Sequence, residues 1–135
     1  MPFTEAEQEY LGRQPLGRLA TRREDGSLQN NPVGFSVDPT TGTVDIGGRA
    51  MGGTRKFHNV AANGVVALVV DDLASRDPWT VRGVEIRGRA EALVDQEAGS
   101  DYMSPEIIRI HPERVISWGL GDDQGMHGRD FDGAA

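Results

Sequence analysis

The stretch from Val81 to Val94 constrains the fold most, because apolar and polar residues alternate along nearly all of it. Such a period of two is typical of a strand that buries one face and leaves the other in water. The apolar run from Val65 to Val70 predicts a second, buried strand over Val65 to Asp71. Gly88 lies inside the alternation, where we expect it to mark a bend. The chain should therefore fold around a β-sheet.

The first half of the chain predicts strands joined by tight turns. Leu16 to Arg23 and Leu28 to Val37 are expected to pair as a hairpin around Asp25-Gly26, a dipeptide that favours short turns. A third strand is expected from Thr43 to Gly47. Pro32 has no N–H to donate, so we expect it at a sheet edge, at a bulge or facing a ligand.

Two short helices are expected beside these strands. Thr4-Glu5-Ala6-Glu7 fits a capping box, which predicts a helix from about Thr4 to Leu11. Thr54 can cap a second helix, which Gly64 would end. A helical turn is expected from Gln96 to Met103.

The second half of the chain predicts further strands. Asp72 to Pro78 is interpreted as a polar connection, and Ile107 to Trp118 as a last strand that Pro112 interrupts. The order helix, three strands, helix, three strands predicts an antiparallel barrel with helices at its sides, in one domain over residues 1–120. Residues 121–135 contain four Gly and four Asp, and we expect them to form an acidic, flexible tail.

Composition excludes several kinds of chemistry. The 135 residues include no Cys, which removes disulfides, thiolate nucleophiles, iron–sulfur clusters and thiolate zinc sites. The three His are scattered singly, so we expect no metal site. A net charge of −7 and few aromatic residues argue against a nucleic-acid partner. With neither an apolar stretch long enough to span a membrane nor a secretory signal, we expect a cytoplasmic protein with no membrane partner.

A glycine-rich segment from Gly47 to Gly53 predicts a loop that leads directly into Thr54-Arg55-Lys56. Free amides at the helix start, two cationic side chains and the Thr54 hydroxyl together indicate an anion site, with phosphate as the expected ligand. The alternative is an ordinary loop followed by solvated cations on an exposed helix face. The Gly-Lys-Ser/Thr pattern does not occur, so nucleotide hydrolysis is not indicated.

Five segments share their order and spacing with a known family. They are Leu16–Thr21 before Asp25-Gly26, Pro32–Phe35, Arg55-Lys56 with Asn59 and Asn63-Gly64 before Val65–Val70, Arg82–Gly88, and Ile110–Trp118. Together they resemble the pyridoxamine 5′-phosphate oxidase-like flavoproteins over residues 3 to about 120. They are most similar to the short actinobacterial branch that uses the deazaflavin coenzyme F420.

The resemblance implies a mainly β (α+β) fold, namely a six-stranded antiparallel split β-barrel of the FMN-binding type with two or three short helices. It also implies a homodimer with two cofactor sites at the subunit interface. The cofactor-binding residues would be Pro32, Val33, Gly34, Ile46, Gly47, Gly48, Arg49, Thr54, Arg55, Lys56, Asn59 and Trp118.

These positions would have different roles. Arg55 and Lys56 would hold the cofactor phosphate with Asn59 beside them. By their charge, Arg49 and alternatively Arg18 or Arg22 would screen the anionic tail of a deazaflavin. The residues from the strands around Pro32 and Gly47 would border the ring system. Trp118 either closes the site from the partner subunit or is a core tryptophan.

The implied activity is hydride transfer between F420 and a conjugated organic acceptor such as an enone, a quinone or a tetrapyrrole. The alternatives are an FMN-dependent flavoprotein and a non-catalytic flavin- or haem-binding module. No catalytic residue is identified, because none of the possible proton donors Tyr10, Tyr102, His111 and Arg87 stands out. Oxidation of pyridoxamine phosphate is disfavoured, since the residues after Trp118 are acidic where those oxidases carry basic groups for the substrate phosphate.

Overall fold

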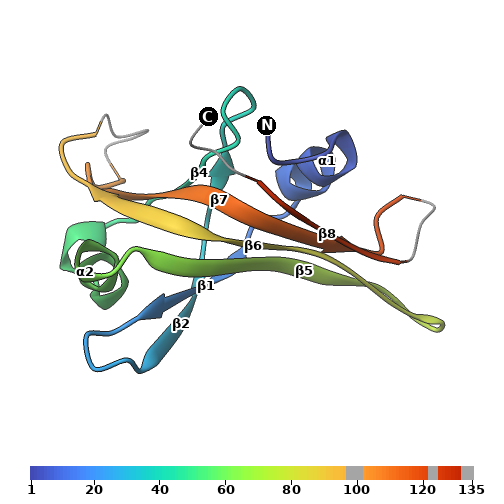
Figure 1. Cartoon of the computed structure of the whole chain (residues 1–135), viewed down its shortest axis with the longest axis horizontal. Coiled ribbons are helices and arrows are strands. Elements are labelled where there is room, and N and C mark those ends of the chain that lie inside the picture. The colour runs from blue at the N-terminus through green and yellow to red at the C-terminus, as the bar shows by residue number, and fades with distance from the viewer. Residues whose placement is uncertain (97–101, 122–124, 132–135) are drawn as a thin grey trace.

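The computed structural model describes residues 1–96, 102–121 and 125–131, which form one curled antiparallel sheet with a helix on either side (Figure 1). In chain order the elements are α1 (Glu5–Arg13), β1 (Gly17–Arg22), β2 (Leu28–Val33), β3 (Ser36–Val37), β4 (Val44–Ile46), the 3₁₀ turn η1 (Met51–Gly53), α2 (Arg55–Ala62), β5 (Val65–Arg76), β6 (Trp79–Leu93), β7 (Ile107–Trp118) and β8 (Met126–Asp130). The strand order is β2-β1-β5-β6-β7-β4-β3, and β8 pairs with β7. The expected mainly β class, an antiparallel split barrel with short helices, is confirmed.

The described part of the chain has eight strands where the sequence predicts six. One difference is that the segment expected as a single strand from Leu28 to Val37 leaves the sheet at Gly34 and Phe35, and so divides into β2 and β3. The other is β8, which pairs with residues 114–118 of β7.

The expectation of a flexible tail after Gly121 is therefore wrong for Met126–Asp130. Backbone pairing with β7 and an ion pair between Arg129 and the buried Glu7 of α1 hold this segment in place. Tail residues 122–124 and 132–135 lie outside the described part of the chain, as does most of the helical turn expected between Gln96 and Met103.

The hairpin of β5 and β6 is longer than predicted and extends well beyond the rest of the sheet (Figure 1). The segment interpreted as a polar connection is strand as far as Arg76, with Asp77-Pro78 as the turn. Its acidic residue Asp72 accepts hydrogen bonds from the Tyr10 hydroxyl at 2.7 Å and from Nε of Arg82 at 3.0 Å. A charged residue can therefore remain in this strand, because its carboxylate is paired with neighbouring elements.

At Gly88, where the sequence predicts a bend, the pairing of β6 with β7 shifts register: Arg87 pairs with Arg114 and Gly88 with Pro112, so Glu113 is an extra residue on β7. A Cβ on Gly88 would lie 2.2 Å from the carbonyl oxygen of His111, so no larger residue fits at this point. An extra residue of this kind increases the local twist of a strand pair, and β6 and β7 remain paired on both sides of it.

The core lies on the inner side of the sheet, where alternate residues of the long strands are fully buried. These include Leu68, Val70, Val84, Ile86, Ile108, Ile110 and Val115. The capping box of α1 is confirmed, with Glu7 N–H donating to Thr4 Oγ1 at 3.2 Å and Thr4 N–H donating to Glu7 Oε1 at 2.8 Å. Thr54 caps α2 as expected, and Phe57 and Val60 turn that helix toward the core.

Candidate functional site

An open cleft of about 620 Å³ separates α2 from the turn between β1 and β2. One wall is a stripe of α2 residues spaced by three or four positions, which places them on one helical face. The other wall is the hairpin turn. The lining residues are Arg55, His58, Asn59 and Ala62 from α2 and Arg23, Glu24 and Asp25 from the turn.

The charges around this cleft come from both walls. Arg55 and Arg23 can each bind a phosphate or a carboxylate through two parallel hydrogen bonds. Asp25 is held within its own turn, because its Oδ1 accepts from the Ser27 hydroxyl at 2.6 Å and from the Ser27 N–H at 2.9 Å. The same Ser27 bonds keep the pKa of Asp25 below its ordinary value. Two guanidinium groups and an imidazole, with acceptors on the turn, suit an organic ligand that carries both an anion and hydroxyl groups.

Asn59, which lines the cleft, connects α2 to the strands of the hairpin whose turn forms the opposite wall. Its Nδ2 donates to Thr21 Oγ1 and to Gln29 Oε1, both at 3.0 Å. Asn59 and Thr21 are almost completely buried, with exposed fractions of 4% and 1%. A primary amide has two N–H donors. Both are therefore engaged with the hairpin.

The glycine-rich loop is fixed by the segment just before β7. The Met51 N–H donates to Ser104 Oγ at 3.1 Å, and the Gly52 N–H donates to Glu106 Oε1 at 3.2 Å. The carbonyl of Gly48 accepts from Ser104 N–H at 2.9 Å and from the Ser104 hydroxyl at 3.1 Å. These two loop amides already have protein acceptors, so an anion near α2 would be held by side chains and by the helix start.

The other predicted residues of this region surround the loop without entering the cleft lining. Thr54 caps α2, and its hydroxyl donates to the Met51 carbonyl at 2.7 Å. Arg49 lies over the ring of Tyr102, 4.5 Å from the centroid. Gly47 faces the methyl group of Met103, and Ile46 is fully buried in the core. Lys56 is half-buried beside Arg55 on α2.

The strand β2 carries the next group of predicted residues. Pro32 lies on an edge strand, as its missing N–H predicts, because β2 pairs only with β1 among the described residues. Pro32 and Gly34 are exposed, whereas Val33 is 5% exposed and belongs to the core. An exposed Pro32 and Gly34 leave the outer edge of β2 open to a flat ligand.

Trp118 lies at the far end of β7 from the part of the sheet that contacts α2 (Figure 1). Its ring covers Gly83 of β6, so that a Cβ on Gly83 would lie 2.4 Å from the ring. One chain therefore does not bring Trp118 together with Arg55.

Several residues of this region were missed by the sequence interpretation. Arg23, Thr21 and Gln29 all flank the predicted Asp25-Gly26 turn, and Ser104 and Glu106 precede the last predicted strand. The hairpin register pairs Thr21 with Gln29, so the predicted turn could have shown that these two residues are neighbours. Nothing in the sequence indicates that α2 lies across this pair. Within the ranges the structure describes, no group of three His, Asp or Glu residues could hold a metal ion. No helix in those ranges is long and apolar enough to cross a membrane.

Known proteins resemble this chain over almost its whole length. A reductase of Streptomyces rimosus, named 5a,11a-dehydrotetracycline/5a,11a-dehydrooxytetracycline reductase, is 48% identical over 97% of this chain and 94% of its own length. A solved structure named F420 Reductase superposes with a TM-score of 0.65 at 24% identity, covering 84% of this chain and 98% of its own. A heme binding protein from Mycobacterium smegmatis superposes with a TM-score of 0.68 at 15% identity, covering 96% of this chain and 59% of its own.

The two structural similarities are similarities of fold. The family described as Pyridoxamine 5'-phosphate oxidase matches residues 3–127, which include every strand except the end of β8. The chain therefore belongs to the pyridoxamine 5′-phosphate oxidase family and is an oxidoreductase of that family.

Proposed function

We propose that this protein is an F420-dependent reductase that delivers a hydride to a conjugated double bond in a polycyclic enone. The observation that carries the proposal is the 48% identity, over nearly the whole chain, with a reductase named for dehydrotetracycline substrates. The F420 reductase of the same fold supports a deazaflavin as the cofactor. The cleft beside Arg55 supports the binding of an anionic arm.

The chemistry of the site is divided between cofactor and protein. When bound, reduced F420 supplies the hydride to one carbon of the double bond, and a proton from solvent or a side chain adds to the other. Arg55 and Arg23, which line the cleft, would hold the cofactor phosphate with Lys56 beside Arg55 on α2, and the exposed Pro32 and Gly34 would lie along the ring. The protein therefore contributes position, charge and exclusion of water.

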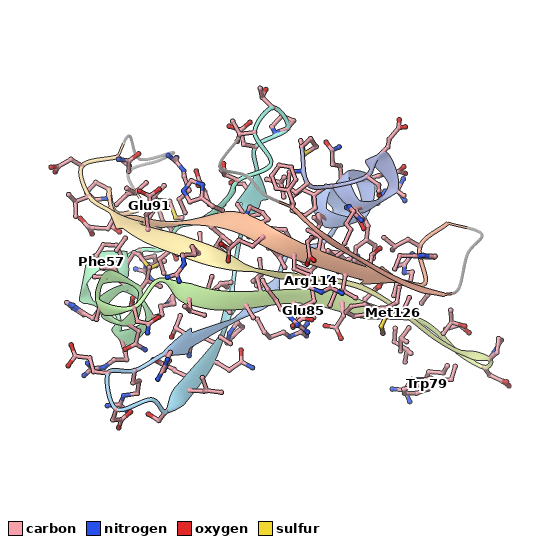
Figure 2. The ribbon with its side chains drawn as sticks, viewed as in Figure 1. Phe57, Trp79, Glu85, Glu91, Arg114 and Met126 are labelled. Carbon is pink, nitrogen blue, oxygen red and sulfur yellow. The ribbon has the colours of Figure 1, made fainter. Side chains whose placement is uncertain are left out.

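We also propose that the protein is a homodimer, because the outer face of its long hairpin is apolar and uncovered in one chain. Leu73 and Val81 pair directly and so share a face, and Trp79 lies two residues from Val81 on the same face. The register of β6, β7 and β8 adds Met126 to it (Figure 2). Their exposed fractions are 37%, 46%, 70% and 72%. A second copy of the chain would remove this surface from water.

The oligomeric state can be measured by multi-angle light scattering. The wild-type protein should have twice the mass of the chain, and Val81→Arg should shift it toward the monomer. Val94→Arg is the matched control, since Val94 is 57% exposed beyond the end of β6. A monomeric wild type would overturn the proposed dimer.

Cofactor binding is the direct test of the proposed function. Purified protein is titrated with F420 and, separately, with FMN, and binding is followed by fluorescence quenching. We expect F420 to bind more tightly, and Arg55→Ala to weaken binding about 10- to 100-fold, which corresponds to the loss of a charge-assisted hydrogen bond. The control is Arg13→Ala, because Arg13 is exposed on α1 in an ion pair with Glu9. Tight binding of FMN alone would indicate a flavoprotein in place of the F420 enzyme.

The acceptor is tested with a panel of conjugated compounds. Protein with reduced F420 is mixed with a dehydrotetracycline, a simple cyclic enone and a quinone, and oxidation of the cofactor is recorded. Turnover should be fastest with the polycyclic enone. Tight F420 binding without turnover of any of these compounds would favour a non-catalytic binding module.

A further inference from the structure

We infer that Asn59 is a positioning residue, which fixes α2 against the first hairpin through Thr21 and Gln29 and thereby sets where Arg55 meets the anionic arm of a ligand. The inference deepens the proposed function and depends on it only for the identity of that ligand. It gives Asn59 a different role from direct contact with a cofactor phosphate.

The hydrogen bonds of Asn59 exclude it as a donor to an anion. Both N–H groups of its amide are directed to the hairpin, to Thr21 Oγ1 and Gln29 Oε1 at 3.0 Å. The remaining polar atom of the side chain is a carbonyl oxygen, which can only accept. The oxygens of a phosphate are also acceptors, so the amide oxygen of Asn59 cannot form a hydrogen bond with them. Asn59 can therefore act on a bound anion only through its neighbours.

Arg55 lies four residues earlier, one turn away on the same helical face, and both residues line the cleft. Thr21 and Gln29 form a directly opposed pair of β1 and β2, close to the turn that carries Arg23. The amide of Asn59 thus joins the helix to the base of this turn. We call the two hydrogen bonds from Asn59 to Thr21 and Gln29 the clamp. Since Arg55 and Arg23 lie on opposite walls, this clamp sets the separation between the segments that carry the two guanidinium groups.

Burial makes this clamp rigid. Asn59 is 4% exposed and Thr21 is 1% exposed, so water cannot easily replace either partner if one is removed. A buried polar group without its partner is costly, which keeps α2 and the hairpin in a single arrangement. Preorganised cations bind an anion more tightly than cations that must first be brought together.

The experiment measures binding of sodium pyrophosphate and of F420 by calorimetry to the full chain. Asn59→Ala should weaken both by about tenfold, because Arg55 and Arg23 would no longer be held at a fixed separation before the anion binds. The control is Asn63→Ala, which removes another structural amide at the end of α2, whose Oδ1 accepts from Val65 N–H at 3.0 Å. Asn63→Ala should leave both affinities unchanged. Equal affinity in Asn59→Ala and the wild type would overturn the inference.

A double variant distinguishes positioning from a purely structural role. If Asn59 acts through Arg55, then Arg55→Ala with Asn59→Ala should bind no more weakly than Arg55→Ala alone. Full additivity of the two losses would overturn the inference, because it would mean that Asn59 contributes independently of Arg55. The deazaflavin alcohol that lacks the phosphate should bind equally to the wild type and to Asn59→Ala, and a loss of affinity there would also count against it.

Variants of the hairpin test the same clamp from the other side. Thr21→Val removes the acceptor for Asn59 while keeping the shape of the side chain, and it should weaken pyrophosphate binding like Asn59→Ala. Thr21→Ser should restore it. If the wild-type protein binds pyrophosphate but not F420, the proposed cofactor is contradicted and the clamp is still supported. If it binds none of pyrophosphate, F420 and FMN, the clamp is overturned.

Discussion

Glu7 and Arg129 form an ion pair that joins the first helix to the last strand across almost the whole length of the sequence. The side chain of Glu7 is 1% exposed, and its Oε2 accepts from Nη1 of Arg129 at 3.0 Å, while Nη2 of the same guanidinium contacts Oε1. Arg129 also donates from Nε to the carbonyl of Pro2 at 3.1 Å. The amino-terminal segment and β8 therefore depend on one another.

Replacing Arg129 by Met should destabilise the fold by about 2 to 4 kcal/mol, because the buried Glu7 carboxylate loses its charge partner. The measurement is the free energy of unfolding in urea. Arg114→Met is the control, since Arg114 contacts Asp130 at 2.8 Å but Asp130 is 83% exposed, and such a surface pair contributes less than about 1 kcal/mol. Equal losses in the two variants would show that the Glu7 pair is no stronger than a surface pair.

Stability should fall in acid through the same residue. Burial alone would raise the pKa of Glu7, but hydrogen bonds from Arg129, Ser117 and the Thr4 N–H outweigh it and lower the pKa below its ordinary value of 4.5. The unfolded chain then binds this proton more readily than the folded chain. The stabilisation is complete above the ordinary pKa and is lost as the pH falls through the lower, folded value.

The acid effect is isolated by comparison with Glu7→Gln. The difference in unfolding free energy between the wild type and this variant should be greatest near neutral pH and should shrink as the pH falls below about 4.5. Other carboxylates with lowered pKa values, such as Asp72 beside Arg82, titrate in both proteins and cancel in the difference. A difference that does not change with pH would contradict the assignment to Glu7.

A chain that ends at Gly121 should be less stable than Arg129→Met. Such a truncation removes the charge partner of Glu7 and also the backbone pairing of β8 with residues 114–118 of β7. The melting temperature, followed by circular dichroism, measures the loss. An unchanged melting temperature would mean that β8 contributes nothing to the fold, as the sequence interpretation of a flexible tail implies.

The strand β8 also shows where sequence patterns stop being informative. Its residues are Met, His, Gly, Arg and Asp, with no apolar alternation, and its position depends on Arg129 reaching a carboxylate 122 residues earlier. By contrast, β6 and the two helix starts at Thr4 and Thr54 were predictable, because alternation and capping depend on residues close together in the chain.

The candidate site divides in the same way. The position of Arg55 at the start of α2, after a glycine loop and a capping Thr54, follows from local sequence. The position of the opposite wall cannot be predicted from local sequence, because it depends on α2 packing across β1 and β2. The hydrogen bond from Asn59 to Thr21 that holds this packing joins residues 38 positions apart. The hydrogen bond from Gly52 N–H to Glu106 likewise cannot be predicted from local sequence, since the two residues are 54 positions apart.

Gly88→Ala should destabilise the protein by at least about 2 kcal/mol. The added Cβ would lie 2.2 Å from the carbonyl oxygen of His111, which belongs to the backbone of β7 and cannot move away as a side chain could. Gly12→Ala is the matched control, because a Cβ there meets nothing within 4 Å and Ala favours the helix, so stability should rise by about 0.5 to 1 kcal/mol. Urea unfolding of both variants measures the contrast, and a tolerated Gly88→Ala would rule out the close approach of β6 and β7.

Glu106→Ala should loosen the glycine loop at a single amide. Gly52 N–H donates to Glu106 Oε1 at 3.2 Å, whereas the neighbouring Met51 N–H donates to Ser104 Oγ at 3.1 Å. Loss of the carboxylate should therefore speed hydrogen exchange at Gly52 about fivefold, the effect of about 1 kcal/mol, and leave Met51 protected. Ser104→Ala should do the reverse, and Glu106→Gln, which keeps an acceptor oxygen, should keep Gly52 protected. Nuclear magnetic resonance measures the exchange rates of the two amides. Equal acceleration of both in Glu106→Ala would contradict the prediction, because it would show that the loop opens as one unit.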